Sequence, residues 1–335
     1  MLFRSTGASH PEEWVGEAVR LGLAAIAVCD RNTLAGVVRA HVAAKTVGLR
    51  SVVGCRLAFC DGTPDVLAWP SDRAAHGRLC RLLTTGNRRA QKGDCRLELD
   101  DLLAFGTGLV LAPLPGRGAL GAEAERLATT LDRLRESFGR EWVRLAAQPL
   151  FGPSDRRRLA GLAHLADQAG VGLLAVGDLL HHVPERRPLA DVLTSIREGV
   201  PLDGAGRRLL PNAERHLRSG EEMARLFRDH PRAVGESVAL LERLTFSLDE
   251  LRYEYPEEDL EGARTPQEAL ERLTREGARR RWPDGVPETV ERALAHEFAI
   301  IGELGYAPYF LTVNDIVSFA RARGILAQEI GRAHV

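Results

Sequence analysis

The chain has 335 residues, of which 44% are apolar, and its formal net charge at pH 7 is −1. Because this length exceeds the usual size of one hydrophobic core, we expect two globular domains. The charge excludes a global positive field, so any contact with DNA would be local. No stretch approaches the roughly 20 consecutive apolar residues that span a bilayer, and we therefore expect a cytoplasmic protein with no membrane partner.

The first expected element is a helix. Ser9 is expected to cap it, with Pro11 in the first turn, Glu12 in a capping box and Gly22 at the end. The same alternation of helical and strand patterns continues through the first half of the chain. We expect strands at 24–29, 51–53, 66–69 and 171–176, and helices at 33–47, 155–169 and around Leu79, Leu82 and Leu83. Repeated strand and helix units with short connections favour parallel strands in an α/β barrel or an open sheet.

The second half of the chain has a different character. Past about residue 191 the pattern is nearly all helical, with breaks at prolines. The acidic stretch 253–259 contains Pro256 and is the expected linker. We place the domain boundary near residue 250.

Two aspartates follow expected strands. Asp30 comes after the strand at 24–29, and Asp178 comes after the strand at 171–176. In parallel α/β architectures such positions meet at one face, where two carboxylates could hold a metal ion. The alternative is that each aspartate caps the next helix or turn.

Other candidate motifs are weak. The adjacent pair His181 and His182 in a loop is more typical of surface or packing residues than of metal ligands. The glycine pairs around Arg117 and Ala205 lack the strand and helix context of a phosphate loop. Five cysteines without a Cys-x-x-Cys pair argue against a disulfide framework or a zinc knuckle.

Several strings along the chain resemble the error-prone branch of the bacterial C-family DNA polymerases, which are similar to the replicative polymerase III alpha subunit. They are collinear and cover nearly the whole chain: GASHPEE at 7–13, DRNTLAGVVRAH at 30–41, LCRLLT at 79–84, HVPERRPL at 182–189, IREG at 196–199, FSLDELRYEYP at 246–256 and GYAPYFLTVNDI at 305–316. The resemblance implies an irregular PHP-type α/β barrel, then a mainly helical segment and the start of a truncated polymerase palm. The implied domains are a PHP-like domain at 1–250, lacking its first strand and His-x-His motif, and the start of the palm at 251–329.

In metal-bearing relatives the PHP pocket holds its metals with several motifs, and this chain departs from them. Thr-Asp-His is replaced by Cys29-Asp30-Arg31, Gly-Cys-Glu by Gly54-Cys55-Arg56, and Asp-x-His by Asp178-Leu179-Leu180, while Asp65 stands where a further histidine is expected. Arginine has no lone pair for a cation. We therefore expect a vestigial, metal-free pocket of Asp30, Arg31, Arg56, Asp65, Asp178 and Leu180, in which the arginines pair with Asp30 and Asp178.

The resemblance also implies that the palm stops before its chemistry. Relatives continue into a Gly-Arg-Gly-Ser loop and later supply the carboxylates that bind Mg²⁺, so no catalytic residue and no cofactor is expected in this fragment. The last six residues, 330–335, are what the DNA string ATCGGAAGAGCACACGTC would encode, and this string matches a common short-read sequencing adapter. We interpret them as an artefact.

Three functions are open. The leading hypothesis is a fragment of a DNA-directed DNA polymerase for translesion synthesis and damage-induced mutagenesis, whose parent uses DNA, deoxynucleoside triphosphates and Mg²⁺. The fragment itself is expected to be inactive. The alternatives are a PHP-type metal-dependent phosphoesterase and a non-catalytic module that binds the sliding clamp or other mutagenesis proteins.

Overall fold

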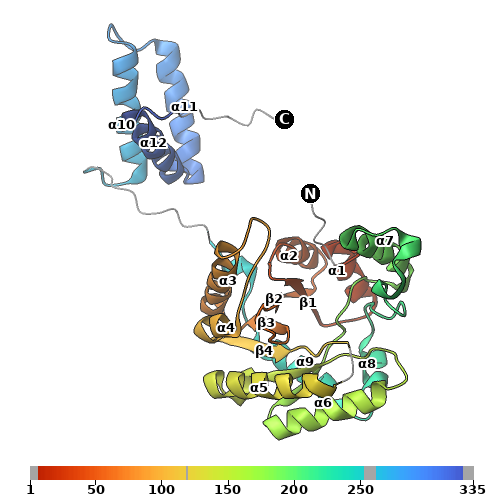
Figure 1. Ribbon diagram of the computed structural model, residues 1–335. Coiled ribbons are helices and arrows are strands. Elements are labelled where there is room, and N and C mark those ends of the chain that lie inside the picture. The colour runs from red at the N-terminus through yellow and green to blue at the C-terminus, as the bar shows by residue number, and fades with distance from the viewer. Residues whose placement is uncertain (1–6, 118–119, 253–261, 327–335) are drawn as a thin grey trace. The chain divides into compact units, whose positions relative to one another are not determined.

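The computed structural model describes residues 7–117, 120–252 and 262–326. The chain divides into two compact units, Met1–Leu251 and Arg252–Val335 (Figure 1). The expected linker at 253–259 and the tail at 330–335 lie outside the described residues.

The first unit opens with two strand and helix pairs: α1 (Pro11–Arg20), β1 (Ala25–Arg31), α2 (Val37–Thr46) and β2 (Arg50–Leu57). Strands β1 and β2 are parallel. The helix start differs from the expected one, because His10 is the N-cap and its amide donates to Glu13 at 2.8 Å. The hydroxyl of Ser9 is instead 2.7 Å from His182 Nδ1, so a tertiary contact displaces Ser9 from the capping role.

The next elements are β3 (Val66–Pro70), α3 (Arg73–Arg88), α4 (Leu99–Phe105) and β4 (Leu109–Pro113). They complete a four-stranded sheet in the order β1-β2-β3-β4. The expectation of parallel strands throughout is wrong here, because β3 is antiparallel to both β2 and β4. No helix separates β2 from β3, so the chain reverses without the crossover that parallel pairing needs.

The last strands of this unit form a parallel pair, and their elements are α5 (Gly121–Phe138), β5 (Arg144–Ala147), α6 (Asp155–Ala169) and β6 (Gly172–Ala175). A single bridge between Leu111 and Val143 connects this pair to the first sheet. Gly170 ends α6 at φ 65°, as its sequence predicts. Among the described residues, no ladder joins β6 back to β1.

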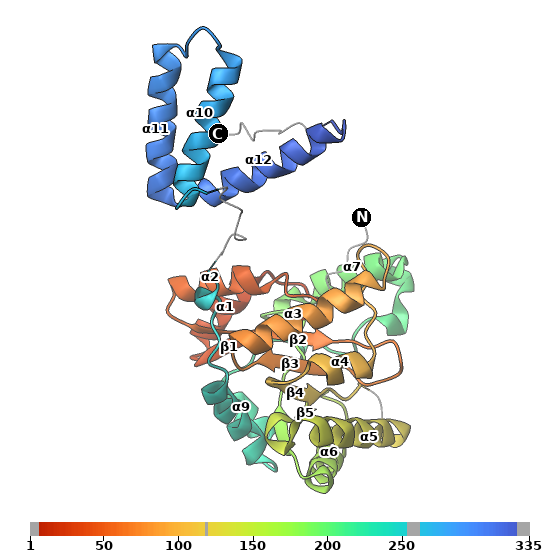
Figure 2. The same cartoon turned by 90° about the vertical axis from the view of Figure 1, so that its left-hand side faces the viewer.

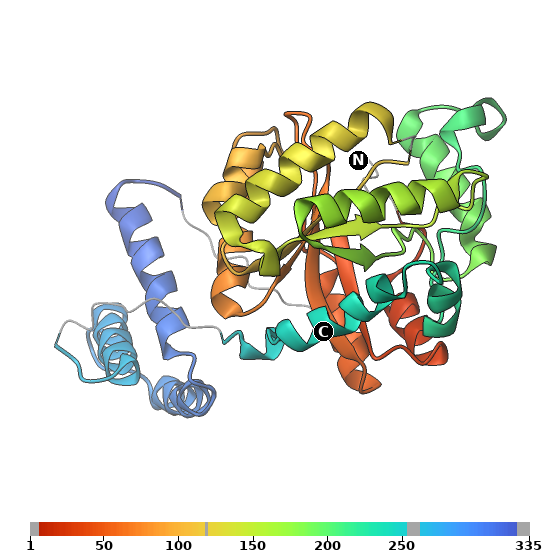
Figure 3. The same cartoon turned by 90° about the horizontal axis from the view of Figure 1, so that it is seen from below.

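The helical remainder of the unit contains α7 (Arg187–Glu198), α8 (Gly220–Leu226) and α9 (Pro231–Arg243), with short 3-10 turns at Arg140–Trp142, Pro184–Arg186, Leu202–Gly204, Gly206–Arg208 and Leu248–Glu250. Strands β1 to β5 lie in order across the unit in Figure 2. In Figure 3, β5 and β6 lie between the helices α5 and α6 on one side and α9 on the other.

The core explains this layering. Leu145 and Ala147 of β5 pack with α5 and α6, whereas Ala146 packs in the cluster that contains Leu240 of α9. Successive strand residues point to opposite faces, so the sheet is buried on both sides. The expected α/β class of the first unit is confirmed.

The second unit is helical: α10 (Pro266–Arg281), α11 (Glu288–Leu304) and α12 (Ala307–Ala322). Thr265 caps α10 by accepting from the Glu268 amide. Gly305, at φ 68°, separates α11 from α12, and Leu270, Phe298 and Leu311 contribute to a small core. In the described part of the chain, no helix is both long enough and apolar enough to cross a membrane.

Candidate functional site

Asp178 is the centre of a charged cluster at the end of β6. Its side chain is 8% exposed and its backbone lies in the left-handed region at φ 46°. Three guanidinium groups surround it: Arg56 Nη1 is 2.9 Å from Oδ1, while Arg215 Nη2 and Arg117 Nη1 are 2.6 and 3.3 Å from Oδ2. Both carboxylate oxygens are therefore occupied by cationic donors.

Arg56 connects this cluster to a second carboxylate. It lies near the end of β2, and its Nε donates to Asp65 Oδ2 at 2.6 Å. Asp65 immediately precedes β3, which pairs with β2, so the antiparallel turn returns this carboxylate to the strand end. The predicted pairing of Arg56 with Asp178 is present in the structure.

Arg215 is the most buried of the three guanidinium groups, with 11% of its side chain exposed. Its Nε also donates to the Asp178 backbone carbonyl at 2.6 Å, so one residue binds both parts of the aspartate. Burial lowers the pKa of Arg215 to about 10, against the opposing effect of the Asp178 charge; Arg117 and Arg56 lower it further. The group stays protonated at neutral pH.

Asp30 does not join the cluster. Its carboxylate accepts the Gly36 amide at 2.8 Å, at the residue before α2, which is the capping role left open as the alternative. A β-carbon at Gly36 would lie 2.6 Å from that carboxylate oxygen. Arg31 is exposed and forms no ion pair with a described residue. The predicted pairing of an arginine with Asp30 is therefore wrong, because the helix start already uses the carboxylate.

Leu180 has a backbone role beside the cluster. Its amide donates to the Arg215 carbonyl and its carbonyl accepts from the Ala8 amide, at 2.9 and 2.7 Å. This short pairing holds the segment of Arg215 against the loop that carries Asp178. An apolar side chain stands where the resemblance places a histidine ligand.

The two adjacent histidines have different environments. His181 is fully buried and its ring is stacked on that of His216, with centroids 6.5 Å apart. Burial lowers the pKa of His181. His182 contacts Ser9 as described above. In residues 7–117, 120–252 and 262–326, no three His, Cys, Asp or Glu side chains are grouped so as to hold a metal ion.

Sequence reasoning missed Arg117 and Arg215. Arg117 had a weak signal, since it lies between two glycines that were considered as a phosphate loop. Arg215 had no local signal, because it comes from an irregular segment whose contacts are set by the tertiary structure. With these two residues, three arginines face two aspartates, and the cluster has an excess of positive charge.

The fold and the site together define a class of protein. It has an α/β unit with an arginine-rich site at its strand ends, and a helical unit follows later in the chain. Residues 268–333, which include most of α10 and all of α11 and α12, match the family model of the bacterial DNA polymerase III alpha NTPase domain. This match includes 330–333, four positions of the tail that we interpreted as an artefact.

Two curated relatives are similar along nearly the whole chain. The error-prone DNA polymerase of Sinorhizobium medicae is 49% identical over 327 residues, and that of Mesorhizobium japonicum is 50% identical over 329 residues. Each alignment covers 98% of this chain and 29% of the relative. The resemblance to error-prone polymerases of the C family is confirmed, and the chain spans less than a third of the length of these relatives.

Two solved structures also resemble part of the chain at 16% identity and a TM-score of 0.39. One is a protein from Bifidobacterium adolescentis proposed to be a metal-dependent phosphoesterase. The match covers 52% of this chain and 83% of that protein's chain. The other is an amidohydrolase from Chromobacterium violaceum, with corresponding shares of 53% and 84%.

Proposed function

We propose that this chain is a segment of an error-prone DNA-directed DNA polymerase that acts in translesion synthesis and damage-induced mutagenesis in the cytoplasm. The observation that carries the proposal is the identity of about one residue in two with error-prone polymerases over 98% of the chain. The parent would take DNA and deoxynucleoside triphosphates and use Mg²⁺ for nucleotidyl transfer. Its catalytic carboxylates would lie outside these 335 residues.

We further propose that residues 1–250 form a PHP-type domain with a structural role, and that residues 251–329 begin the polymerase palm. The occupancy of Asp178 by three arginines supports this role, because a cation would have to displace guanidinium groups that are already hydrogen-bonded. The ion pairs join β2, the segment around Arg117, the end of β6 and the segment of Arg215. Such a cluster ties four parts of the unit together.

Primer extension tests the polymerase proposal. The 335-residue chain should not extend a primed template in the presence of Mg²⁺ and deoxynucleoside triphosphates. A chimera in which residues 7–326 replace the matching segment of the Sinorhizobium medicae polymerase should extend it and should copy past an abasic site. Extension by the chain alone, or failure of a soluble and monodisperse chimera to extend an undamaged template, would contradict the proposal.

Metal analysis separates the structural role from a phosphoesterase. After purification and incubation with Zn²⁺ or Mn²⁺, the chain should hold less than about 0.1 equivalent of metal, since a functional site would be near stoichiometric. Stoichiometric metal, or hydrolysis of a phosphoester that is lost in Asp178→Ala, would support the phosphoesterase. Capture of the sliding clamp by the chain would instead favour a binding module.

A further inference from the structure

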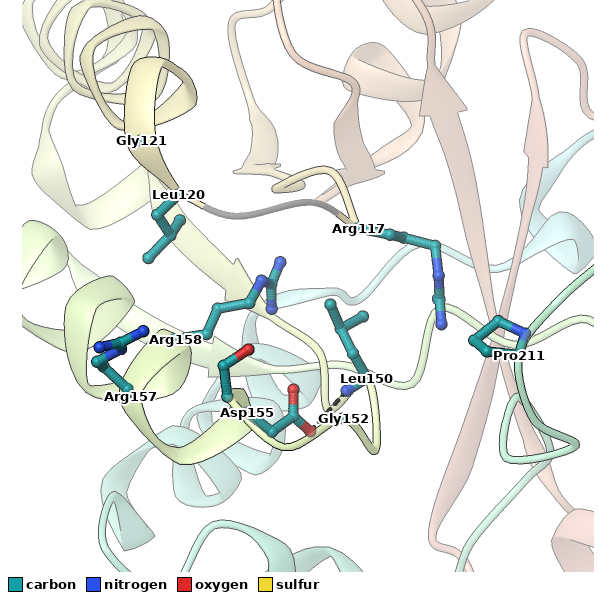
Figure 4. Close-up of a pocket in the computed structure, with 10 residues that line it drawn as sticks. Arg117, Leu120, Gly121, Leu150, Gly152, Asp155, Arg157, Arg158 and Pro211 are labelled. Carbon is teal, nitrogen blue, oxygen red and sulfur yellow. Dashed lines mark hydrogen bonds between the residues drawn. The ribbon is translucent and has the colours of Figure 1, made fainter. Parts of the chain in front are cut away.

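A second feature of the first unit lies beside the Asp178 cluster. It is a cavity of about 580 Å³ where α5 and α6 begin (Figure 4). Arg117, which contacts Asp178, also lines this cavity. Arg157 and Arg158 in the first turn of α6 line it too, together with the apolar side chains of Leu120 and Leu150.

Arg158 is the residue that points to a ligand. It is only 7% exposed, and it extends from α6 toward the centre of the pocket in Figure 4. Its Nη1 and Nη2 donate to the carbonyls of Gln148 and Gly116, but its Nε has no hydrogen-bond partner. No carboxylate in the described part of the chain forms an ion pair with it. Burial lowers the pKa of Arg158, against the opposing effect of the charges on Asp155 and Glu123, and an anion in the cavity would stabilise the buried cation further.

The carboxylates near the cavity are committed elsewhere. Asp155 Oδ2 accepts the amides of Leu150 and Phe151 at 2.7 and 2.8 Å. Glu123 accepts the amide of Gly116. Arg157 is exposed and pairs with no described carboxylate. Three arginines line the cavity together with Asp155, and one of them, Arg117, is also paired with Asp178.

The helix starts add to the positive potential. α5 begins after Leu120, and α6 begins after Ser154. Neither of these two residues forms a side-chain hydrogen bond to the first turn of its helix. Uncapped first turns present backbone N–H groups and the positive end of the helix dipole. Here two such ends line the same cavity as the arginines, which is an arrangement suited to an anion.

We propose that this cavity binds the phosphate group of a small ligand of nucleotide size, with Arg117, Arg157 and Arg158 as its cationic contacts. The cavity volume lies in the usual range for small-molecule sites. Leu120, Leu150 and Pro211 supply apolar surface on which a sugar or base can pack. The inference concerns binding only and does not depend on the proposed polymerase function.

Isothermal titration calorimetry on the 335-residue chain at constant ionic strength tests this proposal. Inorganic phosphate and deoxyadenosine monophosphate should bind competitively, and deoxyadenosine, which lacks the phosphate, should not bind. Arg157→Gln and Arg158→Lys should each weaken phosphate binding about tenfold, because the first removes a positive charge and the second replaces the fixed, planar guanidinium donors by a single ammonium group. Arg156→Gln is the matched control: it removes the same charge one position earlier, where the arginine pairs with Asp229, and should change affinity less than about twofold.

Far-UV circular dichroism of each variant distinguishes lost binding from lost folding. Because Arg157 is exposed, the Arg157→Gln variant should fold normally. The proposal is overturned if the folded chain binds no phosphate at about 10 mM, a concentration that detects even weak sites. It is also overturned if both pocket variants bind as tightly as the unaltered chain. Binding of a single-stranded oligonucleotide without binding of deoxyadenosine monophosphate would reject a small ligand.

Discussion

Arg56 and Asp178 lie 122 residues apart in the chain, and their side chains form an ion pair of 2.9 Å at the ends of two strands. The same aspartate binds Arg117 and Arg215, while Arg56 also binds Asp65. The cluster is thus a network in which one carboxylate pairs with three partly buried cations, one of which also pairs with Asp65. Removal of the Asp178 charge would leave Arg117 and Arg215 without the carboxylate that pairs with them.

We expect Asp178→Asn to lower the free energy of unfolding by about 2 to 4 kcal/mol, because breaking a buried ion pair leaves its partner uncompensated. Asparagine tolerates the left-handed backbone at this position, so the change tests charge rather than conformation. Urea denaturation measures the effect. Asp100→Asn is the control: this side chain is 81% exposed and pairs with Arg133, so its loss should cost less than about 1 kcal/mol. Equal effects of the two substitutions would argue against the network.

Stability should fall with acidification below about pH 6.5, partly through His181. Burial lowers the pKa of this histidine in the folded chain from its ordinary value of 6.5. The unfolded chain therefore binds the proton first as the pH falls, and stability that is fully present above 6.5 is lost. Unfolding free energies at pH 7.5 and 5.5 measure the difference.

His181→Gln should reduce this pH dependence but not abolish it, because burial also lowers the pKa of His76. A slope in His181→Gln as steep as in the unaltered chain would contradict the assignment.

The cysteines should differ in reactivity. Burial raises the pKa of Cys29 to about 12, and it also raises the pKa of Cys55, so neither thiol is ionised at pH 8. Cys60 is exposed. Brief treatment of the folded chain with iodoacetamide, followed by peptide mass spectrometry, should find Cys60 labelled first, and Cys60→Ser should remove the fast phase. Early labelling of Cys29 would show that β1 is more accessible than the structure indicates.

Two glycine substitutions should have opposite effects. A β-carbon at Gly54 would lie 2.4 Å from Cys29 Sγ and 2.9 Å from the Trp69 ring, so Gly54→Ala should destabilise the chain by about 1 to 3 kcal/mol. Gly16 lies within α1 with open space around it, and Gly16→Ala should stabilise by about 0.5 to 1 kcal/mol. Thermal unfolding of the two variants checks both signs. A stabilising Gly54→Ala would show that β1, β2 and β3 pack less closely there.

The tail at 330–335 remains a separate prediction, because it lies outside the described residues. Sequencing of the source DNA across this junction should show the adapter-derived codons replaced by a coding continuation. A genomic copy that encodes the same six residues would reject the artefact interpretation, and the family match through residue 333 makes this check necessary.

Local patterns in the sequence determined much of the helical structure. Gly22 adopts positive φ just after the helix that it was expected to end, and Gly48 and Gly170 do the same just after α2 and α6. These signals depend on steric properties of one residue and its neighbours, which is why they can be read without a fold. Arg31, Arg56 and Leu180 stand where the resemblance places metal ligands, which was likewise visible in residue identity alone, and so was the resemblance to error-prone polymerases.

Only the tertiary structure decided which charges meet. It placed the Asp30 carboxylate at the start of α2, where it accepts the Gly36 amide, and it recruited Arg117 and Arg215 to Asp178. It also reversed β3 between β2 and β4, which returned Asp65 to Arg56. Contacts of this kind depend on how distant segments pack around a shared core, and the sequence carries no local pattern for them. The chain's residues determined which charged side chains the site contains, and the packing of its strands decided how those charges are satisfied.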